Sequence, residues 1–242
     1  MQAIAPDDPR VTRPLLTIRE AAWNLAVAES TFRDWARGYR RQDRGVGLAT
    51  VGEPVVTAVG PGGRTATIPL VGLVEGLVLA AFRRTGVPLQ RIRPALGILG
   101  REIGLAHALA SRGLYSDGAE VLYSYAARGR GDLDDVAEDL VVVRSGQHVF
   151  VDVIRDYLEL ISFGEDGWPE RVGLPAYRSA KVIVDPQLAF GRPIFENGGA
   201  RVEDVIDRWR AGESASELAQ DFGVSAEEIE DAARATSIRA AA

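Results

Sequence analysis

Cysteine is absent from the 242 residues, and Lys181 is the one lysine; there are also only one methionine and two histidines. Without cysteine the chain has no disulfide framework and no thiolate metal site, and nothing indicates secretion. His107 and His148 lie far apart in the sequence, so we expect structural or surface roles for both. We therefore predict no cofactor, no metal and no enzymatic activity.

Long apolar segments are also missing. The N-terminus, MQAIAPDDPR, lacks the apolar stretch of a signal peptide. The longest apolar stretch, Leu70 to Phe82, is too short to cross a bilayer and contains Glu75. The composition, 46% hydrophobic and 26% charged, is typical of globular proteins. We expect a cytoplasmic protein with no membrane partner.

Charge is unevenly distributed along the chain, whose formal net charge is −6. Residues 1–100 hold 13 arginines against 8 acidic residues, a balance of +5. Residues 101–242 hold the remaining 15 basic and 26 acidic residues, a balance of −11. Because salt screens charges beyond about 8–10 Å, the basic end can bind a polyanion although the whole chain is acidic. The two ends therefore have different expected partners.

The first apolar pattern predicts two short helices joined by a tight turn. Thr17 is followed three residues later by Glu20, which predicts a capping box. Apolar residues then recur at helical spacing: Ile18, Ala21, Ala22 and Leu25. Ser30 is the expected cap of the second helix, over residues 30–41, which would bury Phe32, Trp35, Ala36 and Tyr39. This pattern is typical of a helix-turn-helix.

The next segments complete the pattern of a winged helix-turn-helix. Val55–Val59 and Arg64–Ile68 are β-type runs on either side of Gly60–Gly63, which predicts a hairpin. An apolar helix follows from about Leu70 to Arg84, and Pro88 begins another over roughly 89–103. The predicted order is helix, helix, hairpin, helix, helix.

The C-terminal part predicts a second, smaller helical domain. A strand-like run, Val182–Val184, leads through the loop Gly191–Gly199 into three helices. Their expected core residues are Val202, Val205, Ile206, Trp209, Leu218, Phe222, Ile229 and Ala232, with Ser214 and Ser225 as caps of the second and third helices. The segment before it, with strands near 119–126, 140–144 and 147–150 and a helix near 151–158, predicts an α+β connector.

The predicted fold class is mainly α with small β elements (α+β), namely an N-terminal winged helix-turn-helix and a C-terminal three-helix, helix-turn-helix-like domain. The expected divisions are a flexible lead-in (1–14), a DNA-binding domain (15–104), the connector (105–181) and a partner-binding or dimerisation domain (182–242).

Two stretches resemble known families. LTIREAAWNLAVAESTFRDWARG (Leu16–Gly38) and LVEGLVLAAFRRTGVPLQRI (Leu73–Ile92) resemble the DNA-binding head of the MerR regulators, over residues 16–96. The chain departs from these regulators afterwards, because residues 98–111, ILGREIGLAHALAS, are too short and too glycine-rich for their long dimerising coiled coil. The resemblance implies a head that binds DNA.

Residues 183–235 are similar to the domain-of-unknown-function 433 family, a small three-helix domain. The matching residues are Asp185-Pro186, Gly191–Ile194, Arg201-Val202, Ala211–Ser214 and Glu227–Ala233. The usual Gly-Thr-Arg before the first helix is here Gly198-Gly199-Ala200-Arg201, with one extra residue. Members with this long, two-part layout resemble antitoxins of type II toxin–antitoxin pairs of the VapBC kind. The resemblance implies a PIN-like ribonuclease toxin as the partner.

The expected DNA-binding residues lie on and after the second helix. A recognition helix presents its N-terminal side chains to base edges, and flanking basic groups contact phosphates. The candidates are Ser30, Thr31, Arg33, Arg37, Arg40, Arg41 and Arg44, with Arg64 at the tip of the wing. The alternative is a protein-binding three-helix module whose arginines are only solvated.

A protein partner or a second copy is expected at the C-terminal domain, although its helices also follow a helix-turn-helix order. Residues 196–242 hold 5 basic and 11 acidic residues, and the third helix is expected to expose Glu227, Glu228, Glu230 and Asp231, which disfavours phosphates. Arg192, Arg201 and Arg239 are the candidate contacts to the acidic centre of a nuclease. Alternatively, Arg192 and Arg201 brace the loop internally.

The leading hypothesis is therefore an antitoxin that neutralises a PIN-like ribonuclease and binds operator DNA to repress its own operon, as a homodimer. The alternative is a stand-alone MerR-like transcriptional regulator whose middle region senses a small molecule. An enzyme has little support, because no catalytic constellation is found.

Overall fold

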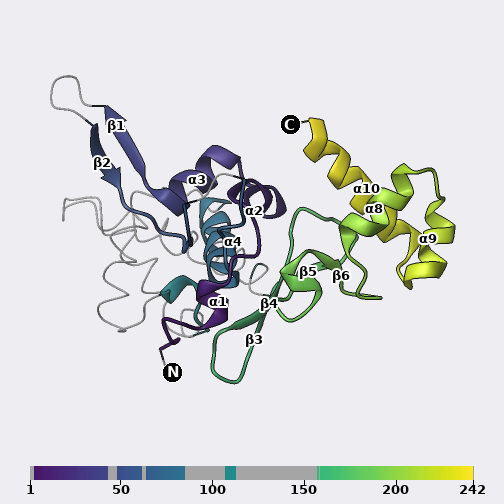
Figure 1. Cartoon of the computed structure of the whole chain (residues 1–242), viewed down its shortest axis with the longest axis horizontal. Helices are drawn as coiled ribbons and strands as arrows, with labels where there is room; N and C mark the ends of the chain where they lie inside the picture. Colours follow the sequence, from purple (N-terminus) through teal and green to yellow (C-terminus); the bar gives the residue numbers. More distant parts are fainter. Residues whose placement is uncertain are drawn as a thin grey trace, which may run out of the picture.

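The computed structural model describes residues 3–42, 48–61, 64–84, 107–112, 157 and 159–241. The N-terminal helices, a small sheet and the C-terminal helices follow one another across the molecule (Figure 1). The N-terminal elements are α1 (Pro9–Thr12), α2 (Ile18–Asn24), α3 (Glu29–Arg37), β1 (Tyr39–Gln42), β2 (Leu48–Gly52), α4 (Leu70–Arg84) and the 3-10 helix η1 (Ala108–Ala110). The C-terminal elements are β3 (Ile161–Phe163), β4 (Pro169–Gly173), β5 (Val182–Val184), the 3-10 turn η3 (Ala189–Gly191), β6 (Ile194–Phe195), α8 (Val202–Arg210), α9 (Ala215–Phe222) and α10 (Ala226–Ala241). The predicted fold class, mainly α with small β elements, is confirmed.

The helix-turn-helix consists of α2 and α3. The capping box of α2 is present: the Thr17 hydroxyl accepts from the Glu20 amide at 3.1 Å, and the Glu20 carboxylate accepts from the Thr17 amide at 2.8 Å. Ala26 forms the turn with a left-handed φ of +53°. The cap predicted at Ser30 is wrong, because α3 begins after Ala28, which makes no side-chain cap.

The second helix is also shorter than predicted. It ends at Arg37, since Gly38 takes a φ of +70° and lies against the Gly52 carbonyl, where a side chain would clash. Tyr39, Arg40 and Arg41 therefore lie in β1, which pairs antiparallel with β2. The predicted helix over 30–41 thus ends four residues early.

The wing is the ribbon β1–β2, and the hairpin predicted over 55–68 is wrong. Val55 and Val56 both donate to the Trp35 carbonyl, and Thr67 and Ile68 donate to the Leu16 carbonyl. The Val59 amide does donate to the Thr67 carbonyl at 2.8 Å, but the Thr57 amide donates to Glu75 of α4, and the Ile68 carbonyl accepts from Leu15 and Leu16. The physical reason is burial: Val56 and Ile68 are core residues, which a protruding hairpin would expose.

Helix α4 is the centre of the N-terminal part, and its predicted range is confirmed. Every residue from Leu70 to Phe82 is buried, including Glu75. Gly76 allows the Phe32 ring of α3 to pack closely, since a methyl group there would lie 2.4 Å from a ring carbon. No helix within the described ranges is both long and apolar enough to cross a bilayer.

Within residues 3–14, for which the prolines predicted a flexible lead-in, a short helix forms and makes long-range contacts. Asp8 caps α1 by accepting from the Arg10 amide at 2.8 Å, and the Arg10 side chain reaches Asp166 at 2.6 Å. Ile4 and Val11 are buried in the common core. Long-range contacts of this kind cannot be read from local composition.

Four antiparallel strands, in the order β3-β4-β5-β6, form the sheet between the helical parts (Figure 1). Val172 of β4 pairs with Val184 of β5, so the sheet continues across the expected boundary at residue 181. Trp168, fully buried, contributes to the core beside it. A single apolar core runs from Ile4 to Ala235, so the N- and C-terminal parts share it.

The three C-terminal helices occur as predicted. Ser214 caps α9 in a capping box with Glu217, and Ser225 and Glu228 form another at α10. Leu218, Ile229 and Ala232 are fully buried.

Two predictions about these helices are wrong. Glu228 and Asp231 point inward: Asp231 accepts from the amides of residues 178–180 at 2.7–3.1 Å, and Glu228 caps its own helix. Trp209 is 38% exposed instead of buried, because it lies at the end of α8.

Several predictions lie outside the described residues. They are the helix over 89–103, the strands near 119–126, 140–144 and 147–150, and most of the helix near 151–158.

Candidate nucleic-acid interface

Helix α3 has one buried face and one exposed face. Phe32, Trp35 and Ala36 are buried, with the two aromatic rings 6.0 Å apart. Ser30, Arg33 and Arg37 are exposed, as predicted for a helix that reads DNA, and Thr31 is half-buried. The packing therefore presents one polar, basic surface to solvent.

Glu29 organises the beginning of this surface. Its carboxylate pairs with Arg33 one turn later, and the Nε of Arg19 on α2 lies 3.8 Å from it. Arg19 and Arg33 are both more than half exposed, so they can exchange this carboxylate for a phosphate. Arg19 was missed from the sequence because a helix-turn-helix pattern does not specify which side chains of its first helix reach the second.

Arg83 adds a third basic group from α4. Its Nη1 donates to the Thr31 hydroxyl at 2.9 Å, although the two residues are 52 positions apart. The N-terminal turn of α3 therefore has arginines from α2, α3 and α4 around it. We define Arg19, Ser30, Thr31, Arg33, Arg37 and Arg83 as the α3 surface. The Arg83-Arg84 pair at a helix end was a signal in the sequence, but only tertiary packing shows which element it contacts.

The other four arginines that were predicted to bind DNA lie outside α3. Arg40 and Arg41 lie in the wing strand β1 and follow α3 directly. Arg44 lies outside the described residues. Arg64 is exposed, but it does not lie on the β1–β2 ribbon, so its predicted place at the tip of the wing is wrong.

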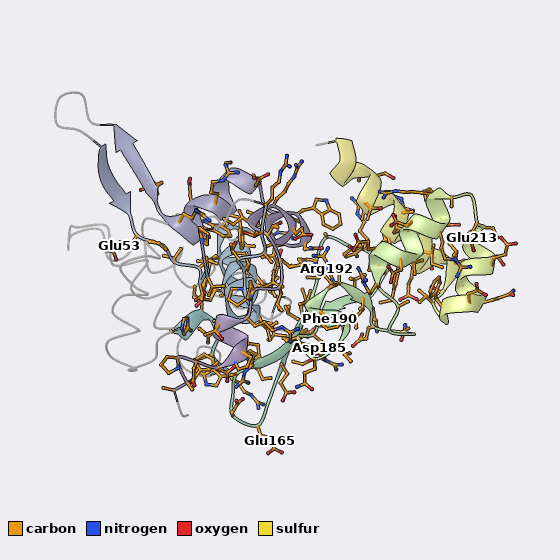
Figure 2. The ribbon with its side chains drawn as sticks, viewed as in Figure 1. Glu53, Glu165, Asp185, Phe190, Arg192 and Glu213 are labelled. Carbon is orange, nitrogen blue, oxygen red and sulfur yellow. The ribbon has the colours of Figure 1, made fainter. Side chains whose placement is uncertain are left out.

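The predicted partner-binding arginines are engaged in ion pairs where their side chains are described. Arg192 lies 3.1 Å from Glu20 of α2 and 3.6 Å from Glu203 of α8. Arg201 lies 2.8 Å from Glu203. Arg239 belongs to the last turn of α10. Figure 2 shows Arg192 between the N-terminal helices and α8, which is where an internal brace would lie.

A buried polar cluster lies on the inner side of α4. His107 Nδ1 is 3.1 Å from a Glu75 carboxylate oxygen and 2.8 Å from the Thr57 hydroxyl, while the Thr57 amide donates to the other Glu75 oxygen at 2.5 Å. The hydroxyl and the carboxylate share one imidazole nitrogen, whereas a catalytic triad uses both. The cluster gives the buried Glu75 two hydrogen-bonding contacts, one with His107 and one with the Thr57 amide.

Comparisons with known proteins match two separate parts of the chain to protein families and most of its length to individual relatives. Residues 14–96 match a family described as "Putative DNA-binding HTH domain", and residues 182–234 match "Protein of unknown function (DUF433)". The chain is 45% identical to the "Putative antitoxin VapB45" of Mycobacterium tuberculosis, over 90% of this chain and 92% of that protein. It is 25% identical to the "Uncharacterized protein Rv2308" of the same organism, over 86% and 84% of the two chains. A crystal structure of Rv2018 from M. tuberculosis superposes with a TM-score of 0.71 at 35% identity, covering 92% of this chain and 99% of that one.

Proposed function

Because this chain belongs to the family that includes the "Putative antitoxin VapB45", we propose that it is the antitoxin of a type II toxin–antitoxin pair. In this proposal the N-terminal domain binds operator DNA and represses the operon, and the C-terminal domain binds and neutralises a PIN-like ribonuclease. The protein acts as a homodimer and catalyses no reaction.

The α3 surface is the observation that carries the DNA-binding part. Its side chains come from three helices, so they are held at fixed spacing by a buried core and not by a mobile tail. Ser30 and Arg33 occupy the first two turns of α3, where a recognition helix contacts base edges. In this proposal Arg19 and Arg83, which contact Glu29 and Thr31 at the beginning of α3, contact phosphates. Arg40 and Arg41 lie in the wing strand β1, which follows α3 in the chain, and in this proposal they contact phosphates as well.

The acidic residues exposed on α8 and α10 support a protein partner at the C-terminal helices. Glu203, Asp204 and Asp207 are exposed on α8, as are Glu227 and Glu230 on α10. DNA phosphates would be repelled by this surface, whereas a protein can offer it basic side chains. We propose that Arg192, Arg201 and Arg239 contact the nuclease, with Arg192 also bracing α2 through Glu20.

The test is co-expression with the nuclease encoded in the adjacent reading frame. Point variants suit it better than truncation, because β5 and Asp231 support the segment before residue 181. Changing both Arg201 and Arg239 to Glu should abolish protection of growth while operator binding persists. Arg234→Glu, a matched change on α10, should protect like the wild type. Full protection by the double variant would contradict the assignment of the partner surface.

The alternative, a stand-alone regulator that senses a small molecule, is favoured by one observation. A cavity of about 450 Å³ lies between α2 and α8, lined by both signs of charge, including Arg19, Glu20, Arg192 and Arg210, and by Tyr177. A gene with no nuclease beside it, whose product loses operator binding when a small molecule fills this cavity, would favour the regulator.

A further inference from the structure

The connection between β5 and β6 exposes two large apolar side chains. Phe190 is 83% exposed and Leu188 is 48% exposed. Phe190 has a φ of +56° and Ala189 a φ of +45°, a left-handed conformation that residues other than glycine seldom adopt. Figure 2 labels Phe190 on this connection, near Asp185. A phenyl ring held in water by an unfavourable backbone conformation indicates a contact site.

The connection is held in place from both sides. Asp185 accepts from the Gln187 amide at 2.8 Å, and Arg13 donates to the Pro186 carbonyl at 3.3 Å. Gly191, with a φ of +77°, lies so close to Leu15 that a methyl group would stand 2.5 Å from its side chain. The phenyl ring therefore extends from a rigid turn, and ordering it against a partner would cost little conformational entropy.

A recess lies beside the ring. It has a volume of about 530 Å³ and is formed by α1 and the residues after it, by Glu170 of β4 and by the 186–190 turn. Within the described part of the chain, two of its charged residues, Arg13 and Glu170, have no ion-pair partner, whereas Asp8 and Arg10 pair with each other. The same patch thus contains an apolar projection, a recess and one unpaired charge of each sign.

We propose that this patch is the interface between two copies of the chain, related by a two-fold axis. In a two-fold interface both copies use the same patch, so this patch must contain both the projecting group and the recess that receives the group of the other copy. Phe190 of each copy enters the recess of the other, and Arg13 of each copy meets Glu170 of the other. The opposite charges make the patch complementary to itself, which a partner of one dominant charge would not match.

The location of the patch fits the function proposed above, on whose homodimer this inference rests. The patch lies on the α1 side of the molecule, whereas α3 and the β1–β2 ribbon lie on the other side (Figure 1). Pairing through Phe190 therefore leaves the α3 surface uncovered in both copies. It also supplies a dimer contact to a chain whose sequence lacks a long coiled coil.

The first test measures the mass of the full chain by sedimentation equilibrium. The wild type should be a dimer, and Phe190→Asn should raise its dissociation constant at least about tenfold. Asparagine tolerates the left-handed conformation, so this change removes the ring and keeps the turn. Ile238→Asn, which alters a 64% exposed side chain on α10, is the matched control and should leave the dimer intact. Circular dichroism should show the same fold for all three chains.

The second test reverses the charges. Arg13→Glu and Glu170→Arg should each weaken the dimer, and the two changes together should restore it, because each copy then again offers one charge of each sign. A dimer unaffected by Phe190→Asn, or charge reversals without mutual rescue, would overturn the interface. A wild-type chain that is monomeric at all concentrations would instead overturn the proposed homodimer, and the two failures are thus distinguishable.

Discussion

Arg192 and Glu20 join the C-terminal part of the chain to the first helix of the helix-turn-helix, with 3.1 Å between the guanidinium and the carboxylate. The other oxygen of Glu20 accepts from the Thr17 amide, so one carboxylate serves both the cap of α2 and this ion pair. Burial works to raise the pKa of Glu20, but the Thr17 amide and the Arg192 charge outweigh it, and the pKa lies below its ordinary value. The Trp23–Tyr177 ring contact, 5.6 Å between centroids, lies at the same contact region.

This relationship predicts a pH-dependent contribution to stability. A carboxylate whose pKa is lowered by folding stabilises the native state above its unfolded pKa of about 4.3, and this stability is lost as the pH falls through the lower, folded pKa. Glu20→Gln should therefore lower the free energy of unfolding by about 1 kcal/mol at pH 7. The difference should shrink below pH 4, as measured by urea unfolding. A difference that is the same at pH 7 and pH 3 would contradict the assignment.

The α3 surface predicts two kinds of loss in DNA binding. Arg33→Ala and Arg37→Ala should each weaken operator binding by about 1–3 kcal/mol where the arginine reads a base. Arg83→Ala should weaken all duplexes alike and reduce the salt slope by about 1, as expected for a phosphate contact. Fluorescence anisotropy over a salt series separates the two effects, with Arg234→Ala as the control. Full-strength operator binding without both Arg33 and Arg37 would show that α3 does not read DNA.

His107 predicts the opposite pH dependence. Its hydrogen bond with Glu75 raises the pKa of His107 above the ordinary value of about 6.5. Its contribution to stability is therefore complete below about pH 6.5 and is lost as the pH rises through the folded pKa. Because the chain has two histidines, imidazole NMR of a His148→Gln variant isolates the signal of His107. Adding Glu75→Gln should lower the measured pKa, and a His107 pKa at or below 6.5 in the presence of Glu75 would contradict this prediction.

Asp231 is expected to be the most sensitive acidic residue of α10. Its carboxylate accepts hydrogen bonds from the backbone amides of residues 178–180, and Asp231→Ala would remove this acceptor from all three, including the buried Ala180 amide. The free energy of unfolding should fall by about 2–4 kcal/mol. The neighbouring Glu230 is exposed, and Glu230→Gln should change it by less than about 0.5 kcal/mol. Equal effects of the two changes in thermal and urea unfolding would refute the role of Asp231.

Local patterns in the sequence were enough to predict the features that depend on residues three or four positions apart, namely helix caps and helix faces. The caps at Thr17, Ser214 and Ser225 each use a glutamate three residues later, and all three are present. The buried and exposed faces of α3 follow from helical spacing, and α4 follows from its length and apolar composition. These features require no knowledge of how distant segments meet.

Tertiary structure decided everything that depends on contacts between distant segments. The segments 55–59 and 64–68 have the residue types of a hairpin, yet Val56 and Ile68 are buried in the core. The wing is formed by β1 and β2 instead. Asp231 has the composition of a solvated face, but residues 178–180, some fifty positions earlier, offer it three amides. Arg83 joins the α3 surface only because α4 packs beneath α3 and brings it to Thr31. Helical spacing and capping act within one turn, whereas burial and ion pairing depend on which segments the folded chain brings together.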